Sequence, residues 1–198
     1  MGLFDFYGQF SFYGAYHNDK GNQWVHIIFV PTISWTVLVW LAAYGPLVEF
    51  AAPAFVSLLP ACMSDGFIIN PAFVVALLYT TYYIILEPIA GALYAPFMMS
   101  LWLSATHFQL TNPNFVAITI GVHIFSWLMQ FASHAFLEGR KPALIDNIAQ
   151  AFLMAPFFVW MEVLFKLGYR PTLRKKLDAT IAAKVAELNA ADKVKKRN

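Results

Sequence analysis

Long apolar runs separated by short polar breaks dominate the chain, and this pattern predicts helices that cross a membrane. Each run comes near the ~20 residues that a helix needs to span the hydrocarbon core. The four runs are Trp24–Tyr44, Phe67–Leu86, Ile89–Thr106 and Phe115–Phe136. We therefore expect an all-α, polytopic membrane protein with about four transmembrane helices.

Three other apolar segments are expected to lie at the interface or to re-enter the membrane. Met1–Tyr16 is aromatic and mixed, which is typical of an interfacial helix. Pro46–Met63 is interrupted by a glutamate and two prolines, so we expect it to be interfacial or re-entrant. Leu144–Leu167 contains Pro156 near its middle, and we expect it to enter the membrane and return.

The C-terminal segment follows a different pattern. Apolar residues recur at spacings of four and three, with lysines off that stripe, which predicts an amphipathic helix packed on the protein or on lipid headgroups. The stripe consists of Leu173, Leu177, Ile181, Val185 and Leu188. We expect residues 1–170 to form a single helical membrane domain and residues 171–198 a basic amphipathic helix and tail.

Composition and charge strengthen the membrane interpretation. Only 12% of the 198 residues are charged, about half the fraction of soluble domains. No Lys or Arg occurs between Lys20 and Arg140, which no soluble fold requires. The positive-inside rule places Lys20, Arg140 and the basic tail in the cytoplasm, with an even number of crossings between the first two. Cys62 is the single cysteine, so no intrachain disulfide is expected, and no nucleic-acid partner is expected either.

Histidines are the candidate functional residues, because the stretch without Lys and Arg keeps four of them: His26, His107, His123 and His134. A titratable side chain in an apolar segment is costly and suggests function. Glu138 follows His134 at i, i+4, so both side chains could reach one ion from the same helix face. His17 and His26 flank the polar turn Asn18–Asn22, and only a turn lets them face one metal, since one continuous helix would separate them by about 13.5 Å.

Geometry favours a metal site made of His17, His26 and His134, near the cytoplasmic face. Glu138 is expected to be an additional ligand or a partner that orients His134. His123 lies about 16 Å from His134 along an unbroken helix and joins the site only if the helix breaks. The alternative for His107 and His123 is a plain hydrogen bond to a neighbouring helix.

Two groups of residues resemble the signatures of a known family. The first comprises Tyr16-His17-Asn18, Asn22, His26 and Phe29-Val30-Pro31-Thr32-Ile33. The second comprises Trp127, Gln130-Phe131, His134, Glu138 and Arg140-Lys141-Pro142-Ala143-Leu144-Ile145-Asp146-Asn147, followed by Ala155-Pro156, Glu162 and Phe165-Lys166-Leu167-Gly168. The chain resembles the iron-dependent 2-hydroxy fatty acid dioxygenases of the endoplasmic reticulum, known from phytosphingosine degradation in fungi. Ser133 stands where that pattern is expected to have a glycine.

The resemblance implies an Fe(II) cofactor held by His17, His26 and His134, a long-chain 2-hydroxy fatty acid as substrate and O2 as co-substrate. Three protein ligands on an octahedral ion leave three positions, which suffice for a chelating 2-hydroxy acid and for oxygen. Arg140, Lys141 and Gln130 are expected to contact the substrate, and Glu138 is the candidate catalytic residue. The expected location is the endoplasmic reticulum membrane, and the sequence leaves the oligomeric state open.

Three other kinds of protein compete with this interpretation. A di-iron fatty acid hydroxylase or desaturase resembles clusters of about eight histidines in HxxHH-type boxes, which the five scattered histidines of this chain do not form. A haem protein could use two histidines from facing helices. A non-enzymatic membrane scaffold needs no metal at all.

Overall fold

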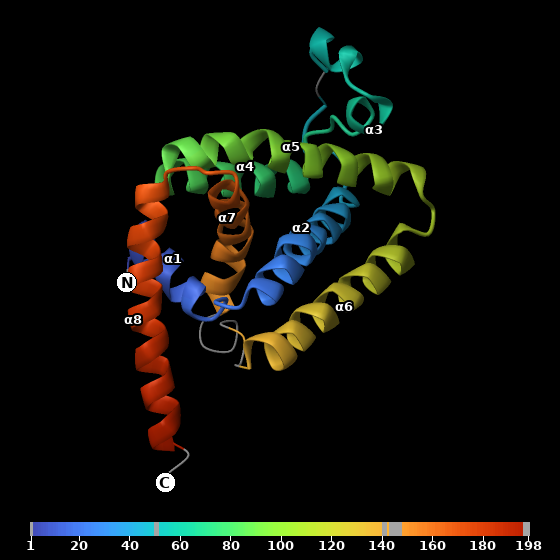
Figure 1. Ribbon diagram of the computed structural model, residues 1–198. Helices are drawn as coiled ribbons and strands as arrows, with labels where there is room; N and C mark the ends of the chain where they lie inside the picture. Colours follow the sequence, from blue (N-terminus) through green and yellow to red (C-terminus); the bar gives the residue numbers. More distant parts are fainter. Residues whose placement is uncertain (1, 50–51, 140–141, 143–147, 196–198) are drawn as a thin grey trace. The chain divides into compact units, whose positions relative to one another are not determined.

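The computed structural model describes residues 2–49, 52–139, 142 and 148–195, and this part of the chain is helical and contains no strand (Figure 1). The predicted all-α class is thereby confirmed. The chain divides into two compact units, unit 1 from Met1–Ile28 with Met129–Asn198 and unit 2 from Phe29–Leu128. The boundaries between the units fall inside two long helices, α2 (Lys20–Ala42) and α6 (Phe115–Ser133).

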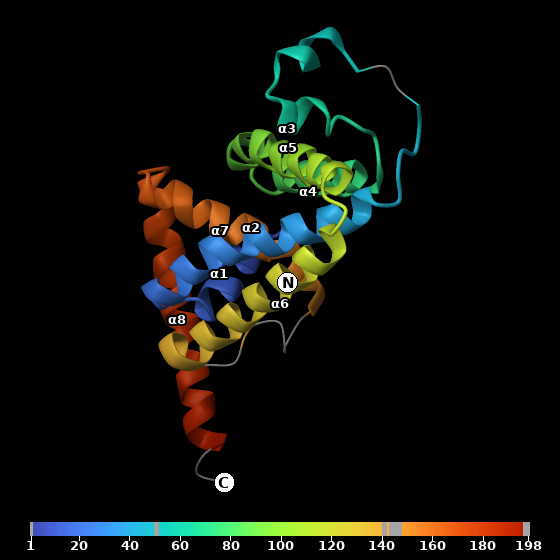
Figure 2. The same ribbon diagram turned by 90° about the vertical axis from the view of Figure 1, so that its right-hand side faces the viewer.

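Unit 1 contains the N-terminal and C-terminal segments of the chain. Besides the ends of α2 and α6, its elements are α1 (Phe6–Ala15), the π-helical turn η2 (His134–Glu138), α7 (Ile148–Lys166) and α8 (Pro171–Lys195). Aromatic rings join α1 to α7, with centroids 4.8 Å apart for Phe10 and Phe158 and 5.0 Å apart for Tyr13 and Phe158. Figure 2 shows α1 and α7 in unit 1 from a second side.

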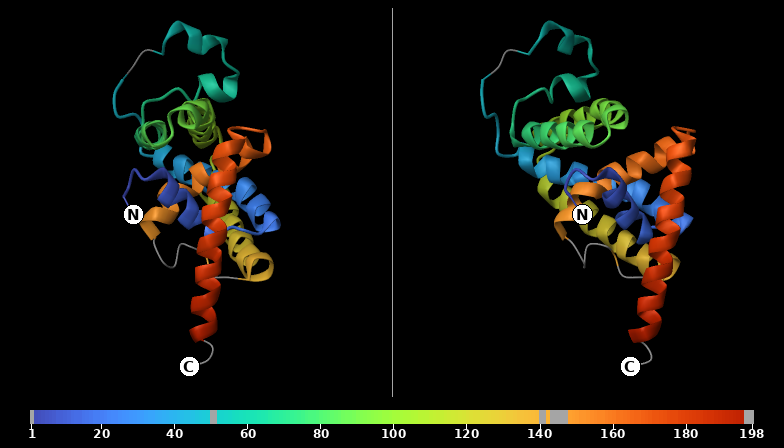
Figure 3. Two further views of the ribbon diagram at one scale, coloured as in Figure 1. Left: turned by 60° about the vertical axis from the view of Figure 1, so that its left-hand side comes forward. Right: turned by 90° about the vertical axis from the view of Figure 1, so that its left-hand side faces the viewer.

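The amphipathic C-terminal helix is present as predicted. α8 is a single helix of 25 residues (Figure 3). It packs against α1, and the first three residues of its apolar stripe, Leu173, Leu177 and Ile181, are buried. The domain boundary predicted at residue 170 stays a prediction, but the start of α8 contributes side chains to the core of unit 1.

Unit 2 is built around a helical hairpin. Its elements, besides the adjoining parts of α2 and α6, are the 3-10 turn η1 (Ala54–Leu58), the short α3 (Ala61–Ser64), α4 (Pro71–Leu86) and α5 (Pro88–Thr111). α4 and α5 lie side by side (Figure 1). Gly91 makes this possible, because a Cβ there would collide with the backbone of Tyr83 and Ile84.

The helix starts follow local rules. Asn70 and Glu87 precede α4 and α5, and each side chain accepts a hydrogen bond from the backbone amide three residues later. A proline follows each cap at the first helical position, where it costs no hydrogen bond. Asp19 caps α2 in the same way by accepting from the amide of Asn22 at 2.9 Å. These polar residues therefore set where the apolar helices begin.

Three helices in the described part of the chain are long and apolar enough to cross a bilayer: α2, α5 and the continuous segment Phe115–Glu138. The fourth predicted span forms the shorter α4, whose 16 residues extend roughly 24 Å at 1.5 Å per residue. In the described part of Pro46–Met63, only η1 and the four-residue α3 are helical, which agrees with a segment that does not cross.

One expectation is wrong. Leu144–Leu167 was expected to turn back at Pro156, but α7 runs as a single helix from Ile148 to Lys166 with the proline inside it. A proline removes one backbone hydrogen bond, and a packed helix in an apolar setting tolerates this loss when neighbouring groups compensate. α7 packs on α1 on one side.

Candidate metal centre

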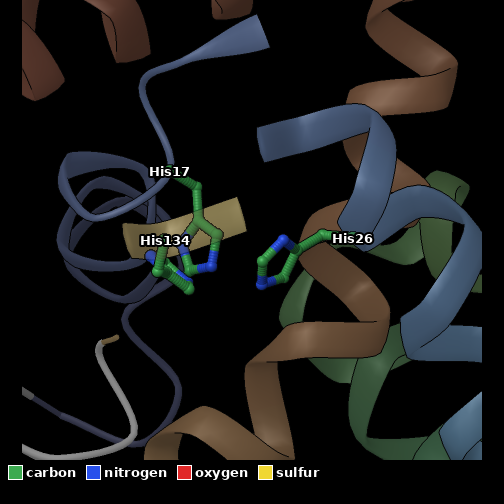
Figure 4. Close-up of side chains that lie close together, drawn as sticks. All are labelled: His17, His26 and His134. Carbon is green, nitrogen blue, oxygen red and sulfur yellow. The ribbon is translucent and has the colours of Figure 1, made fainter. Parts of the chain in front are cut away.

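Three histidines meet in unit 1, although they are far apart in the sequence. His17 lies between α1 and α2, His26 lies in the second turn of α2, and His134 opens η2. The ring centroids are 4.5 Å apart for His17 and His26, 4.8 Å for His17 and His134, and 4.9 Å for His26 and His134. Figure 4 shows the three imidazoles gathered around a common point.

Local hydrogen bonds fix the tautomers of two rings. His17 donates from Nδ1 to the carbonyl of Tyr13 at 2.8 Å, and His26 donates from Nδ1 to the carbonyl of Asn22 at 2.9 Å. A carbonyl only accepts, so Nδ1 must carry the proton in both rings and Nε2 keeps a lone pair. Both acceptors lie four residues before the histidine, a spacing that recurs in helices.

The cluster is buried and contains unpaired nitrogens. The three side chains are at most 2% exposed, and neither Nε2 of His17 nor Nδ1 of His134 has a hydrogen-bond partner. A buried polar atom without a partner costs free energy unless an ion or a water satisfies it. Burial, followed by the nearby His26 and His134, lowers the pKa of His17 well below its usual range, so His17 is neutral near pH 7.

These residues fit a metal ion. One ligand nitrogen from each ring lies within 4.8 Å of the other two. Neutral imidazole is a common ligand of transition metals, with bonds of about 2 Å. To bind one shared ion, the three rings must therefore move closer together than they are in the structure. Tyr13 limits the movement of one ring, because it stacks on His17 at 4.2 Å and 9°.

Glu138, the last residue of η2, contacts the loop that carries His17. Its Oε1 accepts from the backbone amide of Asn18 at 3.1 Å, and its Oε2 accepts from the backbone amide of Asp19 at 2.8 Å. Its predicted role as an additional ligand or as the partner that orients His134 stays a prediction, and so does its predicted catalytic role.

The element that joins His134 to Glu138 was not predicted. Residues His134–Glu138 form a π turn, in which the amide of Gly139 bonds back to the carbonyl of His134. Gly139 has φ 66°, which glycine adopts without strain, and it ends the helix. Single π turns inside α-helices are frequent at functional sites, but no apolar periodicity predicts them.

The other two histidines lie in unit 2, and His123 has hydrogen-bond partners at both ring nitrogens. Trp127 donates from Nε1 to Nε2 of His123 at 2.9 Å. Nδ1 of His123 lies 2.7 Å from the hydroxyl of Thr36, which belongs to the neighbouring α2. Nδ1 of His107 lies 3.5 Å from a carboxylate oxygen of Asp65. The alternative of a structural hydrogen bond is therefore confirmed for His123.

Of the three residues predicted to contact the substrate, one lies in the described part of the chain. Gln130 is buried in α6, one turn before His134. Arg140 and Lys141 lie outside the described residues. Substrate contact stays a prediction for all three.

A second set of polar residues, one from α2 and one from α7, lies at the loop of His17. Gln23 donates from Nε2 to the carbonyl of His17 at 2.9 Å, and Lys166 donates to Oε1 of Gln23 at 3.4 Å. Sequence reasoning missed Gln23, because no periodicity marks a side chain that bonds a backbone carbonyl six residues away.

The geometry defines a class of protein: helical, with apolar helices long enough to cross a membrane, and with a buried three-histidine site suited to a metal. Residues 3–167 match the family model described as "2-hydroxy-palmitic acid dioxygenase Mpo1-like". The chain is also 30% identical over 187 residues to the 2-hydroxy-palmitic acid dioxygenase MPO1 of Saccharomyces cerevisiae, which covers 94% of this chain and 95% of that protein. No solved structure matches. The chain therefore belongs to the Mpo1-like dioxygenase family.

Proposed function

We propose that the chain is an Fe(II)-dependent enzyme that converts a long-chain 2-hydroxy fatty acid and O2 into the fatty acid one carbon shorter, CO2 and water. The observation that carries this proposal is the buried cluster of His17, His26 and His134 with its unpaired nitrogens. The name of the yeast relative suggests the substrate class. The reaction balances without a further co-substrate, because the hydroxy acid supplies all four electrons that reduce O2.

In this proposal the three histidines hold the iron, which suits imidazole ligands. When bound, the metal would polarise the hydroxy acid and activate oxygen. The chain itself supplies neutral imidazoles whose protons are held away from the site by the carbonyls of Tyr13 and Asn22. Burial of the three side chains keeps water from competing for their lone pairs.

The remaining predicted residues act on the substrate or on the geometry of the site. Arg140 and Lys141 guide the carboxylate of the hydroxy acid, and Gln130 offers a polar contact one helical turn from His134. Glu138 positions the loop of His17, which is supported by its bonds to the amides of Asn18 and Asp19.

We also propose that the protein lies in the endoplasmic reticulum membrane, with the site near the cytoplasmic face and the acyl chain in the hydrocarbon core. Three helices of spanning length support membrane insertion. The positive-inside rule supports the orientation, since Lys20 follows His17 closely and Arg140-Lys141 follow His134.

Anaerobic reconstitution tests the reaction. Purified full-length protein is loaded with Fe(II), the bound iron is measured, and 2-hydroxyhexadecanoic acid is added in air. We expect one iron per chain and a product one carbon shorter, identified by mass spectrometry. Two irons per chain would favour a di-iron hydroxylase, and iron-loaded protein that leaves the hydroxy acid intact would contradict the proposal.

A pair of histidine variants tests the site. His134→Ala should lose both iron and turnover, because it removes one of three ligands. His123→Ala is the matched control and should keep both, because Trp127 and Thr36 occupy its two nitrogens in unit 2. Full iron content and full activity in His134→Ala would show that the site is assigned wrongly.

A further inference from the structure

Asn22 is a fully buried polar residue in the first turn of α2, four residues before His26. Its Nδ2 donates to Oε2 of Glu138 at 3.1 Å, and its Oδ1 accepts from the hydroxyl of Ser133 at 2.7 Å. Its backbone carbonyl accepts from Nδ1 of His26 at 2.9 Å. Three of its polar groups therefore bond residues of the metal centre or residues beside it.

Each of these bonds leads to a segment that carries a histidine. Ser133 directly precedes His134, and Glu138 ends the π turn that His134 begins. Glu138 also accepts from the amide of Asn18, the residue after His17. The third bond reaches the ring of His26 itself. Asn22 thus connects the segments of all three histidines, although Ser133 and Glu138 lie more than a hundred positions away in the sequence.

The orientation of the Asn22 amide follows from its neighbours. Both carboxylate oxygens of Glu138 already accept from backbone amides, so the NH2 group of Asn22 must face Glu138 and its oxygen must face the hydroxyl of Ser133. The hydroxyl of Ser133 carries one proton and lies near two acceptors, Oδ1 of Asn22 at 2.7 Å and the carbonyl oxygen of Gln130 at 2.8 Å. Breaking a bond in a buried network of this kind leaves a desolvated polar group. Ser133 matters for the same reason, since the glycine expected at its position could not donate this bond.

We propose that Asn22 is the positioning residue of the three-histidine centre, and that the affinity of this centre for a divalent metal depends on the Asn22 amide although the amide is not a ligand. The inference rests on the proposed metal-binding function. It goes beyond that function by assigning the geometry of the centre to the bonds from Asn22 to Ser133 and Glu138.

The test uses Co(II) as the probe, because its visible absorption reports ligand geometry without O2 or substrate. The full-length protein and its Asn22→Ala and Ser133→Ala variants are titrated with Co(II) against a competing chelator. Asn70→Ala is the matched control. Asn70 is also fully buried, and it also uses both amide atoms, accepting from the amide of Phe73 and donating to Thr106. It belongs to unit 2, whereas His17, His26 and His134 belong to unit 1.

We expect Asn22→Ala to weaken Co(II) binding by about 10–100-fold, the usual effect of losing a residue that orients metal ligands, and to change the Co(II) spectrum. Ser133→Ala removes one of the bonds and should weaken binding by up to about tenfold. Asn70→Ala should lower the thermal unfolding temperature but leave Co(II) affinity and spectrum unchanged.

The outcomes separate a positioning role from a structural one. If Asn22→Ala loses thermal stability but binds Co(II) with the affinity and spectrum of the unmodified protein, the inference is overturned. If Asn22→Ala does not fold, Ser133→Ala decides, and unchanged affinity in that variant overturns it.

The same experiment separates this inference from the proposed reaction. Unmodified protein that binds Co(II) and Fe(II) but does not shorten the hydroxy acid overturns the reaction, and weaker binding by the Asn22 variant still supports the inference. Unmodified protein that binds neither metal overturns both.

Discussion

At the scale of single residues, the candidate centre depends on which nitrogen of each ring is free. Spacing and the intervening turn predicted that His17, His26 and His134 meet, and the structure brings them together. Spacing did not predict that Nδ1 of His17 and of His26 would each donate to a carbonyl four residues earlier. These bonds determine that Nε2 carries the lone pair in both rings.

Glu138 provides a test at this scale. We expect Glu138→Ala to lower stability by about 1–2 kcal/mol, because the amides of Asn18 and Asp19 lose the acceptor at the start of α2. Iron retention should fall with it, since the loop carries His17. Thermal unfolding and metal content of the purified protein measure the two effects.

Glu187→Ala is the matched control for this variant, because it removes a glutamate from an exposed position on α8. If Glu138→Ala and Glu187→Ala have the same unfolding temperature and the same iron content, the bonds from Glu138 to the loop contribute neither to stability nor to iron retention.

At the scale of elements, α8 is tied to α7 by an ion pair. Nη1 of Arg174 donates to Oε1 of Glu162 at 2.6 Å, and the side chain of Glu162 is only 3% exposed. Burial opposes the charge on Arg174, but Glu162 and Asp178 outweigh it, and the pKa of the guanidinium is raised. The family match ends at residue 167, so this pair joins α8 to the part of the chain that the family defines.

We expect Arg174→Ala to destabilise unit 1 by about 2–4 kcal/mol, because it leaves the buried Glu162 carboxylate with Lys166 at 3.7 Å as its remaining ion-pair partner among the described residues. The double variant Glu162→Gln with Arg174→Ala should recover part of the loss, since no buried charge remains. Thermal unfolding of Arg174→Ala, Glu162→Gln and the double variant in one detergent measures the coupling. Additive losses in the double variant would contradict it.

The hairpin of α4 and α5 gives a second test at this scale. Gly91→Ala places a Cβ against the backbone of Tyr83 and Ile84, and overpacking of this kind costs about 1–3 kcal/mol. Thermal unfolding should show the loss. Gly121→Ala is the control, because a Cβ at that exposed position of α6 meets no atom within 4 Å. Equal stability of the two variants would contradict the close packing.

At the scale of the whole molecule, the apolar surface of the long helices is the main feature. Three helices of spanning length expose large apolar side chains such as Ile28, Leu93, Ile124 and Leu128. Exposed apolar residues on this scale are typical of contact with lipid. The proposed orientation in the membrane follows from the positive-inside rule and the position of Lys20 and of the basic residues after Gly139.

Topology can be tested with single cysteines in a Cys62→Ser background. Lys20→Cys, next to the turn after His17, should react with a membrane-impermeant maleimide added to sealed microsomes whose cytoplasmic face is outside. Asn114→Cys, in the loop between α5 and α6, should react only after detergent is added, since the predicted crossings place it on the other face. Labelling in the reverse order would show that the orientation is wrong.

The sequence by itself determined the helical membrane class, the family resemblance, the amphipathic C-terminal helix and the three histidines, because apolar runs, charge and local spacing report which residues share a face. Only the tertiary structure decided that α7 continues through Pro156, that His134–Glu138 is a π turn, and that Asn22 bonds both Ser133 and Glu138. Those features depend on hydrogen bonds and packing between segments far apart in the chain. Periodicity is a local property, and it carries no information about which distant partner will satisfy a buried polar atom.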